Sequence, residues 1–223
     1  DFLGAATIGT GAAIAGLSAS PVLAQAGSAP GQVDFPDEPG TFGSGGSAAG
    51  SVNRAEIELF DCEVEGTLPR DLDGVFYRVG PDPQYPKPPE YARDIAFDGE
   101  GHVSMFRIQN GHVDYRTRYA RTQRWKAQHE ARRSLFGMYR NPLTDDPSVK
   151  GLSRGTANTQ LFVHHGKLLV FKEDSPPVYM DPLTLETRDD YYTFGGKLDS
   201  ETHTAHPKID PLTGEYFGFG YEA

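Results

Sequence analysis

Cysteine is nearly absent from this chain of 223 residues, and basic residues are fewer than acidic ones. The single cysteine, Cys62, excludes an intrachain disulfide and a zinc or iron–sulfur site built from several thiolates. The 21 basic against 31 acidic residues give a formal charge of −10, which argues against a general nucleic-acid binder, because such a protein needs a basic face. The chain also lacks a glycine-rich phosphate loop and a Gly-x-Ser-x-Gly nucleophile elbow, so nucleotide-binding and hydrolase functions are disfavoured.

Glycine and proline are abundant, with 26 and 17 residues, beside 13 Phe and 11 Tyr. This mixture favours many short strands joined by turns over long helices, and it predicts an all-β fold. Asn110-Gly111, between the β-rich runs 102–108 and 112–119, predicts a tight hairpin, because both residues accept the positive φ of a type I′ turn.

Two features of the second half of the chain repeat this turn chemistry. Strands are predicted at 161–164 and 167–171, hinged at His165-Gly166. The tetrapeptide Asp-Pro-Leu-Thr occurs at both 181–184 and 210–213. Recurring turns between strands are typical of a serially repeated sheet unit such as a β-propeller.

Further strands are predicted at 56–60 and 75–79, and a helix at 125–136 after a capping Thr122. The last residues, 216–221, contain aromatic residues and glycine in a pattern that predicts a strand continuing to the end of the given sequence. Because a propeller closes its ring so that its edge strands are protected, this pattern predicts that the chain is the front part of a longer propeller.

The first residues differ from the rest in composition. An uncharged, moderately apolar run ends in Ala24-Gln25-Ala26, which predicts an export signal at 1–26 with cleavage after Ala26, whereas its glycines and shortness disfavour a membrane span. Its start resembles the part of a twin-arginine signal that follows the arginine pair. Residues 27–54 are rich in Gly, Ser and Pro and predict a linker, so the folded domain is expected at 55–223. The expected location is the periplasm, or the cytoplasm if the leader does not function, and membrane attachment stays open.

The histidines and carboxylates form no evident site by spacing alone. On an extended strand, the members of His164/His165 and of His203/His206 point to opposite faces and cannot share one metal ion. A structural or surface role is therefore the expectation for any one of these histidines taken alone. The paired carboxylates are adjacent in sequence and do not have the facing arrangement that glycoside hydrolysis needs.

Four segments resemble the carotenoid cleavage oxygenase family, most closely its lignostilbene dioxygenase branch. They are 64–81, 97–102, 157–159 and, above all, 204–215 with its Ala-His-Pro-Lys-Ile-Asp-Pro run. The resemblance spans about residues 56–223. It implies part of a seven-bladed β-propeller with a helical and loop dome, which holds one Fe(II) on its axis by four histidines and binds O2 as co-substrate.

The resemblance assigns roles to particular residues. His206 would be the first iron ligand, whereas His203 would not be a ligand, and the other three ligands would lie beyond this chain. Glu173 matches a glutamate that accepts a hydrogen bond from the N–H of a ligating imidazole of another blade and so fixes its tautomer. Without the resemblance, Glu173 would be interpreted as an exposed charge in a turn.

The resemblance also implies how substrate is bound. Lys172 stands where carotenoid-cleaving members tend to have an aromatic residue, and the segment 137–142 resembles the stilbene branch, in which Tyr139 and Lys172 hold the substrate's 4-hydroxyl group. These two groups can stabilise a phenolate and increase the electron density of the conjugated double bond. Phe97 matches a ring-packing position near the iron and is expected to help bind the substrate. Without the resemblance, Lys172 would be an ordinary surface charge and Phe97 a core residue.

Through this resemblance we predict an iron-dependent dioxygenase that cleaves the central double bond of a phenolic stilbene into two aromatic aldehydes, with the fragment alone inactive. Two alternatives stay open. One keeps the iron and takes an apocarotenoid or carotenoid as substrate. The other is a non-catalytic, metal-free propeller that binds a small molecule outside the cytoplasm. The oligomeric state is not indicated.

Overall fold

The computed structural model describes residues 53–95 and 97–220 of the chain. The predicted export signal, 1–26, and nearly all of the predicted linker, 27–54, lie outside these residues. The described part consists of antiparallel sheets with one α-helix, which confirms the all-β prediction. No helix of the described residues is long and apolar enough to cross a membrane.

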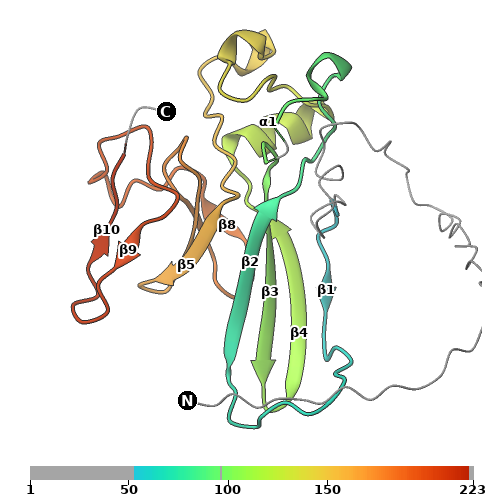
Figure 1. The fold of residues 1–223 in the computed structure, drawn as a ribbon, viewed down its shortest axis with the longest axis vertical. Coiled ribbons are helices and arrows are strands. Elements are labelled where there is room, and N and C mark those ends of the chain that lie inside the picture. Colours follow the sequence, from blue (N-terminus) through green and yellow to red (C-terminus); the bar gives the residue numbers. More distant parts are fainter. Residues whose placement is uncertain (1–52, 96, 221–223) are drawn as a thin grey trace, which may run out of the picture. The chain divides into compact units, whose positions relative to one another are not determined.

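The described strands form three sheets in chain order (Figure 1). The first sheet has the order β1-β4-β3-β2 and contains β1 (Glu58–Leu59), β2 (Gly74–Pro81), β3 (Gly101–Gln109) and β4 (His112–Tyr119). The second has the order β5-β6-β7-β8 and contains β5 (Gln160–His164), β6 (Lys167–Phe171), β7 (Val178–Met180) and β8 (Thr187–Asp189). The third pairs β9 (Lys208–Ile209) with β10 (Tyr216–Phe217).

Both predicted hairpins are confirmed. Asn110 and Gly111 join β3 to β4 with φ values of 54° and 83°, the left-handed pair that a type I′ turn requires. His165 and Gly166 join β5 to β6 in the same way, with φ values of 47° and 72°. The predicted strand 56–60 is shorter than expected, because only Glu58 and Leu59 pair with β4.

The repeated tetrapeptide forms the same turn twice. Asp181 follows β7, and its Oδ1 accepts from the N–H groups of the second and third residues after it, both at 2.9 Å. Asp210 follows β9 and accepts equivalent bonds at 2.7 and 3.1 Å. The left-handed position of the first turn is held by Leu185, with φ 58°, and that of the second by Gly214, with φ 73°. Leu185 is only 1% exposed.

The helix α1 (Gln123–Ala131) begins at the predicted cap, since the Thr122 Oγ1 accepts from the Trp125 N–H at 3.1 Å. The predicted end at residue 136 is wrong. Arg132 takes a left-handed conformation, with φ 55°, and ends the helix. Figure 1 shows α1 and the loops around it at one end of the sheets. Three short 3-10 turns belong to these loops: Pro89–Tyr91, Pro142–Thr144 and Pro147–Val149.

Strand β6 is the centre of the packing because it is buried on both faces. Leu168 and Val170 point to a core shared with Val103 of the first sheet. Leu169 and Phe171, on the opposite face, belong to a second core that includes residues next to β9 and β10. Each fully buried Leu, Val or Phe side chain contributes about 1.5–3 kcal/mol. The three sheets are thus joined by two successive apolar layers.

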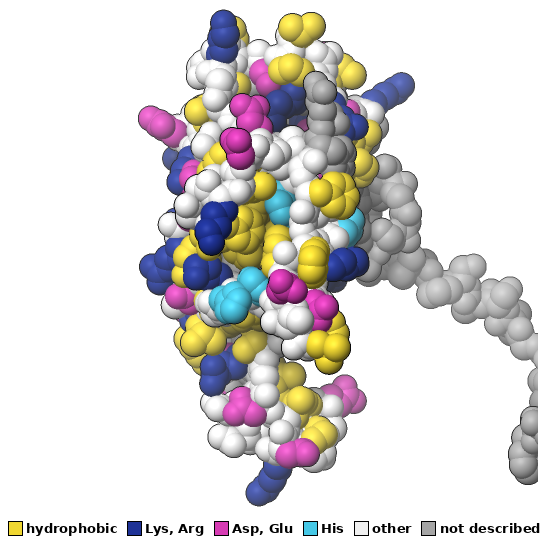
Figure 2. Space-filling model, turned by 90° about the vertical axis from the view of Figure 1, so that its left-hand side faces the viewer, with side chains coloured by type: hydrophobic (Ala, Val, Ile, Leu, Met, Phe, Trp, Pro, Cys, Tyr) yellow, Lys and Arg dark blue, Asp and Glu magenta, His cyan; other side chains and the backbone are white. Residues whose placement is uncertain are grey.

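The outward faces of this arrangement remain partly apolar. On the first sheet, Leu59, Tyr115, Phe106 and Phe76 lie in one cross-strand row, and Phe76 is 59% exposed. On the side of β9 and β10, Phe217 is 56% exposed. Figure 2 views the molecule from that side and shows hydrophobic and histidine side chains exposed between charged ones.

The predicted strand at 216–221 is also shorter than expected. Pairing with β9 covers only Tyr216 and Phe217, and the next backbone bond leads to a different segment, from the Thr204 N–H to the Phe219 carbonyl at 2.7 Å. Gly218 packs closely there, because a Cβ at this position would lie 2.4 Å from the His203 Nε2.

Candidate active site

Three of the predicted site residues lie together and form an aromatic–lysine cluster: Phe97, Tyr139 and Lys172. Lys172 directly follows β6 and is only 4% exposed. Its Nζ lies 3.5 Å from the Tyr139 hydroxyl, 4.9 Å from the centroid of the Phe97 ring and 5.3 Å from that of the Tyr139 ring. The two rings meet edge-to-face, with centroids 5.4 Å apart. Residues from three separate chain segments thus surround one ammonium group.

The Lys172 ammonium is held in its charged form. Burial alone lowers the pKa of Lys172, but the electrostatic interactions with Asp174, with the Tyr139 oxygen and with Glu173 outweigh it and raise the pKa above its usual range. The Glu173 Oε2 accepts from Nζ at 3.2 Å. Contact with two aromatic faces further favours a cation at this place. Lys172 is therefore a buried, permanently charged donor, and the interpretation as an ordinary surface charge is wrong.

The cluster lines a cavity of about 570 Å³, together with Glu173, Arg140 and Asn158. Such a volume suits a small aromatic ligand. Phe97 is 47% exposed, so it is not a core residue, and its ring offers a flat apolar surface beside the ammonium. Glu173 lies in the turn after β6 and is half-buried.

Asn158 holds Phe97 in place. Its Nδ2 donates to the carbonyl oxygens of Phe97 and Gly99, both at 2.7 Å. The chain segments also approach closely nearby, since a Cβ on Gly101 would lie 1.8 Å from the Ala157 carbonyl oxygen. Only glycine fits this crossing, and it brings the start of β3 against the segment that carries Asn158.

A buried ion cluster also fixes the loop that carries Phe97. Arg124 of α1 donates to Asp98 at 2.8 Å and to Glu100 at 2.9 Å, and all three side chains are at most 3% exposed. Lys87 donates to Asp98 at 2.6 Å. These charge-assisted bonds connect the helix, the loop before β3 and the loop after β2. They position Phe97 through its neighbour Asp98.

Tyr139 is held by a related group of contacts. Its backbone N–H donates to the Asp94 carboxylate at 2.6 Å, and Lys87 forms an ion pair with the same carboxylate. Burial alone raises the pKa of Asp94, but the hydrogen bonds from Lys87 and from backbone N–H groups lower it below its usual range. Lys87 also donates to the Gly137 carbonyl at 2.9 Å. Lys87 therefore joins the segments that carry Phe97 and Tyr139.

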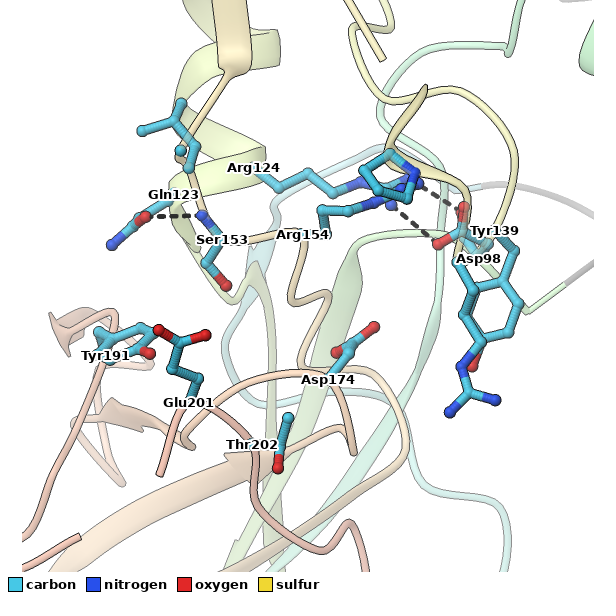
Figure 3. Close-up of a pocket in the computed structure, with 14 residues that line it drawn as sticks. Asp98, Gln123, Arg124, Tyr139, Ser153, Arg154, Asp174, Tyr191, Glu201 and Thr202 are labelled. Carbon is cyan, nitrogen blue, oxygen red and sulfur yellow. Dashed lines mark hydrogen bonds and ion pairs between the residues drawn. The ribbon is translucent and has the colours of Figure 1, made fainter. Parts of the chain in front are cut away.

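A second cavity, of about 620 Å³, adjoins the first, because Tyr139 and Arg140 line both. Figure 3 shows the Asp174 carboxylate pointing into this space below Arg154. Burial raises the pKa of Asp174, against the opposing charges of Lys172 and Arg124.

His206 lies apart from this cluster, in the histidine segment (201–207). This segment has no strand structure, so the argument from alternating strand faces does not apply to it. The side chains nevertheless point to different surroundings. His206 is exposed, and its Nδ1 lies 2.8 Å from the Gln160 Oε1. His203 is 2% exposed, and its nitrogens bond to the Thr204 carbonyl at 2.7 Å and to the Tyr216 hydroxyl at 2.8 Å. Burial lowers the pKa of His203, although the Thr204 bond opposes it.

Among the described residues, no group of three or more His, Cys, Asp or Glu side chains could hold a metal ion. His206 therefore belongs to no such group within this part of the chain.

Sequence reasoning missed the residues that position the site. Asn158 lies within the recognised segment 157–159, which could have suggested a role for it. Arg124 and Lys87 gave no signal, because a charged residue that is buried through pairing looks like any surface charge in a sequence. Gln160 was missed for a similar reason, since its partner is 46 residues away.

Comparison with known proteins gives consistent matches. The family described as retinal pigment epithelial membrane protein matches residues 50–223. Lignostilbene-alpha,beta-dioxygenase isozyme III of Sphingomonas paucimobilis is 55% identical over 170 residues, which cover 76% of this chain and 34% of the relative. Isoeugenol monooxygenase of Pseudomonas nitroreducens is 51% identical over 170 residues, which cover 76% and 35%.

A solved structure supports the same relationship. The crystal structure of Pseudomonas brassicacearum lignostilbene dioxygenase matches with a TM-score of 0.74 at 44% identity, over 85% of this chain and 38% of that chain. The chain thus spans about a third of the length of the curated relatives that it matches.

Proposed function

The chain belongs to the carotenoid cleavage oxygenase family, which the retinal pigment epithelial membrane protein profile describes, and on this premise we propose that it is part of an iron-dependent dioxygenase. The proposed reaction cleaves the central double bond of a 4-hydroxylated stilbene with O2 and releases two aromatic aldehydes. The observation that carries the proposal is the buried Lys172 ammonium beside the Tyr139 hydroxyl and the Phe97 ring.

These three side chains suit one end of a phenolic substrate. The Lys172 ammonium and the Tyr139 hydroxyl can both donate to a phenolate oxygen, and burial strengthens each bond. The exposed face of Phe97 can pack against the substrate ring. Negative charge held on the phenolate oxygen increases the electron density of the conjugated alkene, which makes it more reactive towards activated oxygen.

The donor chemistry of His206 fits one position of an iron site. Its Nδ1 is engaged by Gln160, so the neutral ring presents the lone pair of Nε2, the atom that a metal would bind. Iron bound by His206 and three further imidazoles would supply the activation of O2. Glu173, whose Oε2 is occupied by Lys172, keeps its other carboxylate oxygen for a hydrogen bond from an imidazole of another blade.

We further propose that the three sheets are blades of a larger, seven-bladed propeller capped by the α1 region as part of a dome. The partly exposed apolar row on the first sheet and the exposed Phe217 on the side of β9 and β10 support this, because blades of a propeller cover each other's faces. The coverage of about a third of each relative supports it as well.

Isoeugenol oxidation is a second candidate, which the 51% identity to an isoeugenol monooxygenase favours. Isoeugenol is also a 4-hydroxyphenyl alkene, so it would use the same aromatic–lysine cluster. An apocarotenoid has no phenol for the Lys172 ammonium to bind, and a metal-free binding protein would have no use for His206.

Export through the leader at 1–26 also remains a proposal, which N-terminal sequencing of the secreted protein would test at Ala26.

The test uses the full-length protein that contains this chain. Purified protein is assayed for iron and for cleavage of 4-hydroxystilbene, 4-methoxystilbene and isoeugenol, with the aldehydes identified by mass spectrometry. We expect one iron per chain and cleavage of 4-hydroxystilbene, with little turnover of the methoxy compound, because its oxygen cannot become a phenolate. Equal turnover of both stilbenes would contradict the role of the cluster, and protein without iron that binds but does not cleave would identify a binding module.

A further inference from the structure

The histidine segment fixes the backbone on both sides of His206 while its side chain points outward. Ala205 is fully buried in the core that includes Phe171, and Pro207 is also buried. The proline restricts the preceding His206 to an extended backbone. The His206 N–H donates to the Thr204 Oγ1 at 3.1 Å. The position of the His206 Cα is therefore well defined. The side-chain rotamer and the ring nitrogen that carries the proton are not set by these contacts.

Gln160 is the residue that reaches this imidazole. It opens β5 and pairs across the ladder with Phe171, so its backbone is part of the second sheet. Residues two apart on a strand share a face, so Gln160 points to the same side as Phe162, which packs in the core next to β9 and β10. This is the side on which His206 lies, and the Gln160 Oε1 is 2.8 Å from its Nδ1.

The chemistry of this contact selects one tautomer. An amide oxygen only accepts hydrogen bonds, so the His206 Nδ1 must carry the proton. A neutral ring that is protonated at Nδ1 has its lone pair on Nε2. A free imidazole in water populates both tautomers, and only one of them can bind a metal through Nε2. The hydrogen bond thus restricts both the proton and the ring orientation.

We propose that Gln160 is a positioning residue that fixes the Nδ1–H tautomer of His206 and directs Nε2 at the metal, an inference that rests on the proposed iron site. The resemblance assigns glutamates such as Glu173 to accept the ring N–H of the other ligating imidazoles. Gln160 accepts the ring N–H of His206 in the same way. An uncharged amide is the acceptor here, so His206 contributes to the site without adding a negative charge next to the metal.

The test compares three variants of the full-length protein. Gln160→Leu removes the acceptor at similar size, and Gln160→Glu keeps an acceptor at the same distance. Gln109→Leu is the matched control, because Gln109 also lies at the end of a strand and donates to an exposed partner, Asp73, at 3.0 Å. We expect Gln160→Leu to bind iron about 10-fold more weakly, with Gln160→Glu and the control close to the unmodified protein.

A second measurement does not need iron. Nitrogen-15 NMR of histidine-labelled, metal-free protein reports which ring nitrogen of His206 carries the proton, with His206→Gln to assign the signal. We expect the Nδ1–H form in the unmodified protein and in Gln160→Glu, and a mixture in Gln160→Leu. An Nε2–H form in the unmodified protein, or an unchanged tautomer and iron affinity in Gln160→Leu, would overturn the proposal. If the unmodified protein held no iron, the proposed function would fail, whereas the tautomer comparison would still decide the role of Gln160.

Discussion

The aromatic–lysine cluster and the histidine segment are built in opposite ways. The cluster gathers three side chains from separate loops, and buried charges hold each loop: Asp98 beside Phe97, Asp94 at Tyr139. The histidine segment presents one exposed imidazole from a short stretch anchored by apolar burial, with a single amide as its partner. The comparison separates three side chains gathered from distant segments, which support the proposed recognition of a phenol, from a single proposed metal ligand, His206.

Substitutions in the two regions should therefore have different effects. Changes in the cluster should impair binding of the phenol and leave iron in place. Changes in the histidine segment should remove iron and leave binding of the phenol intact. The following predictions, all for the full-length protein, test this separation.

Replacing His206 should have the largest effect. His206→Ala removes a proposed ligand, and we expect iron content and stilbene cleavage to fall by more than about 100-fold, because even partners of ligands account for 10–100-fold. Binding of a phenolic stilbene, followed by quenching of intrinsic fluorescence, should change little. Retention of stoichiometric iron would show that His206 is not a ligand. His164→Ala, at a half-buried histidine that ends β5, is the control and should keep its iron.

Breaking the ion cluster should have the next largest effect. Arg124→Met leaves the buried carboxylates of Asp98 and Glu100 without their shared partner, and we expect a loss of about 3–5 kcal/mol in the free energy of unfolding, measured by denaturant titration. Arg121→Met is the control, because the ion pair of Arg121 with Glu56 is partly exposed and should account for less than about 1 kcal/mol. Similar losses in both variants would mean that the buried cluster does not hold the Phe97 loop.

Removing the Lys172 charge should affect only turnover of phenols. Lys172→Met should lower kcat/KM for 4-hydroxystilbene about 100-fold, which corresponds to about 3 kcal/mol, and leave the iron content unchanged. Lys167→Met is the matched control on the same strand, since Lys167 lies over the ring of Tyr179, away from the cavity. Unchanged turnover in Lys172→Met would favour an apocarotenoid substrate.

The smallest effect concerns pH. Burial lowers the pKa of His203, so the unfolded chain takes up a proton before the folded one as the pH falls. Stability should therefore be complete above about pH 6.5, the ordinary histidine value, and decline below it. His203→Phe should abolish this part of the decline in denaturation midpoints.

His112 has a raised pKa from its bond to Asp61, so His112→Gln should change the pH dependence with the opposite sign: stability supplied by His112 is present at low pH and lost as the pH rises.

Local chemistry made much of the fold predictable. Asn110-Gly111 and His165-Gly166 determine their hairpins by backbone conformation alone, and Thr122 marks the start of α1. The end of α1 was not predictable, because Arg132 takes a left-handed conformation that its side chain does not demand. The predicted terminal strand failed for a similar reason, since Gly218 packs against His203 instead of continuing a ladder.

The site was predictable only through the resemblance. Nothing in the sequence around Lys172 shows that it is buried, because its partners Tyr139 and Phe97 lie 33 and 75 positions earlier. The supporting contacts are equally distant, as between Asn158 and Phe97, which are 61 residues apart. Long-range pairs of polar groups are decided by how the segments pack, and packing leaves no local pattern in the sequence.

The paired Asp-Pro-Leu-Thr turns show what a leucine can tolerate. Leu185 adopts a left-handed backbone that costs a side chain about 1–2 kcal/mol, yet its complete burial contributes about 1.5–3 kcal/mol in return. At the equivalent place a side chain on Gly214 would meet no neighbouring atom, and there a glycine suffices. Grafting the first turn onto another protein therefore requires an apolar pocket for the Leu185 side chain, whereas the second turn requires no such pocket.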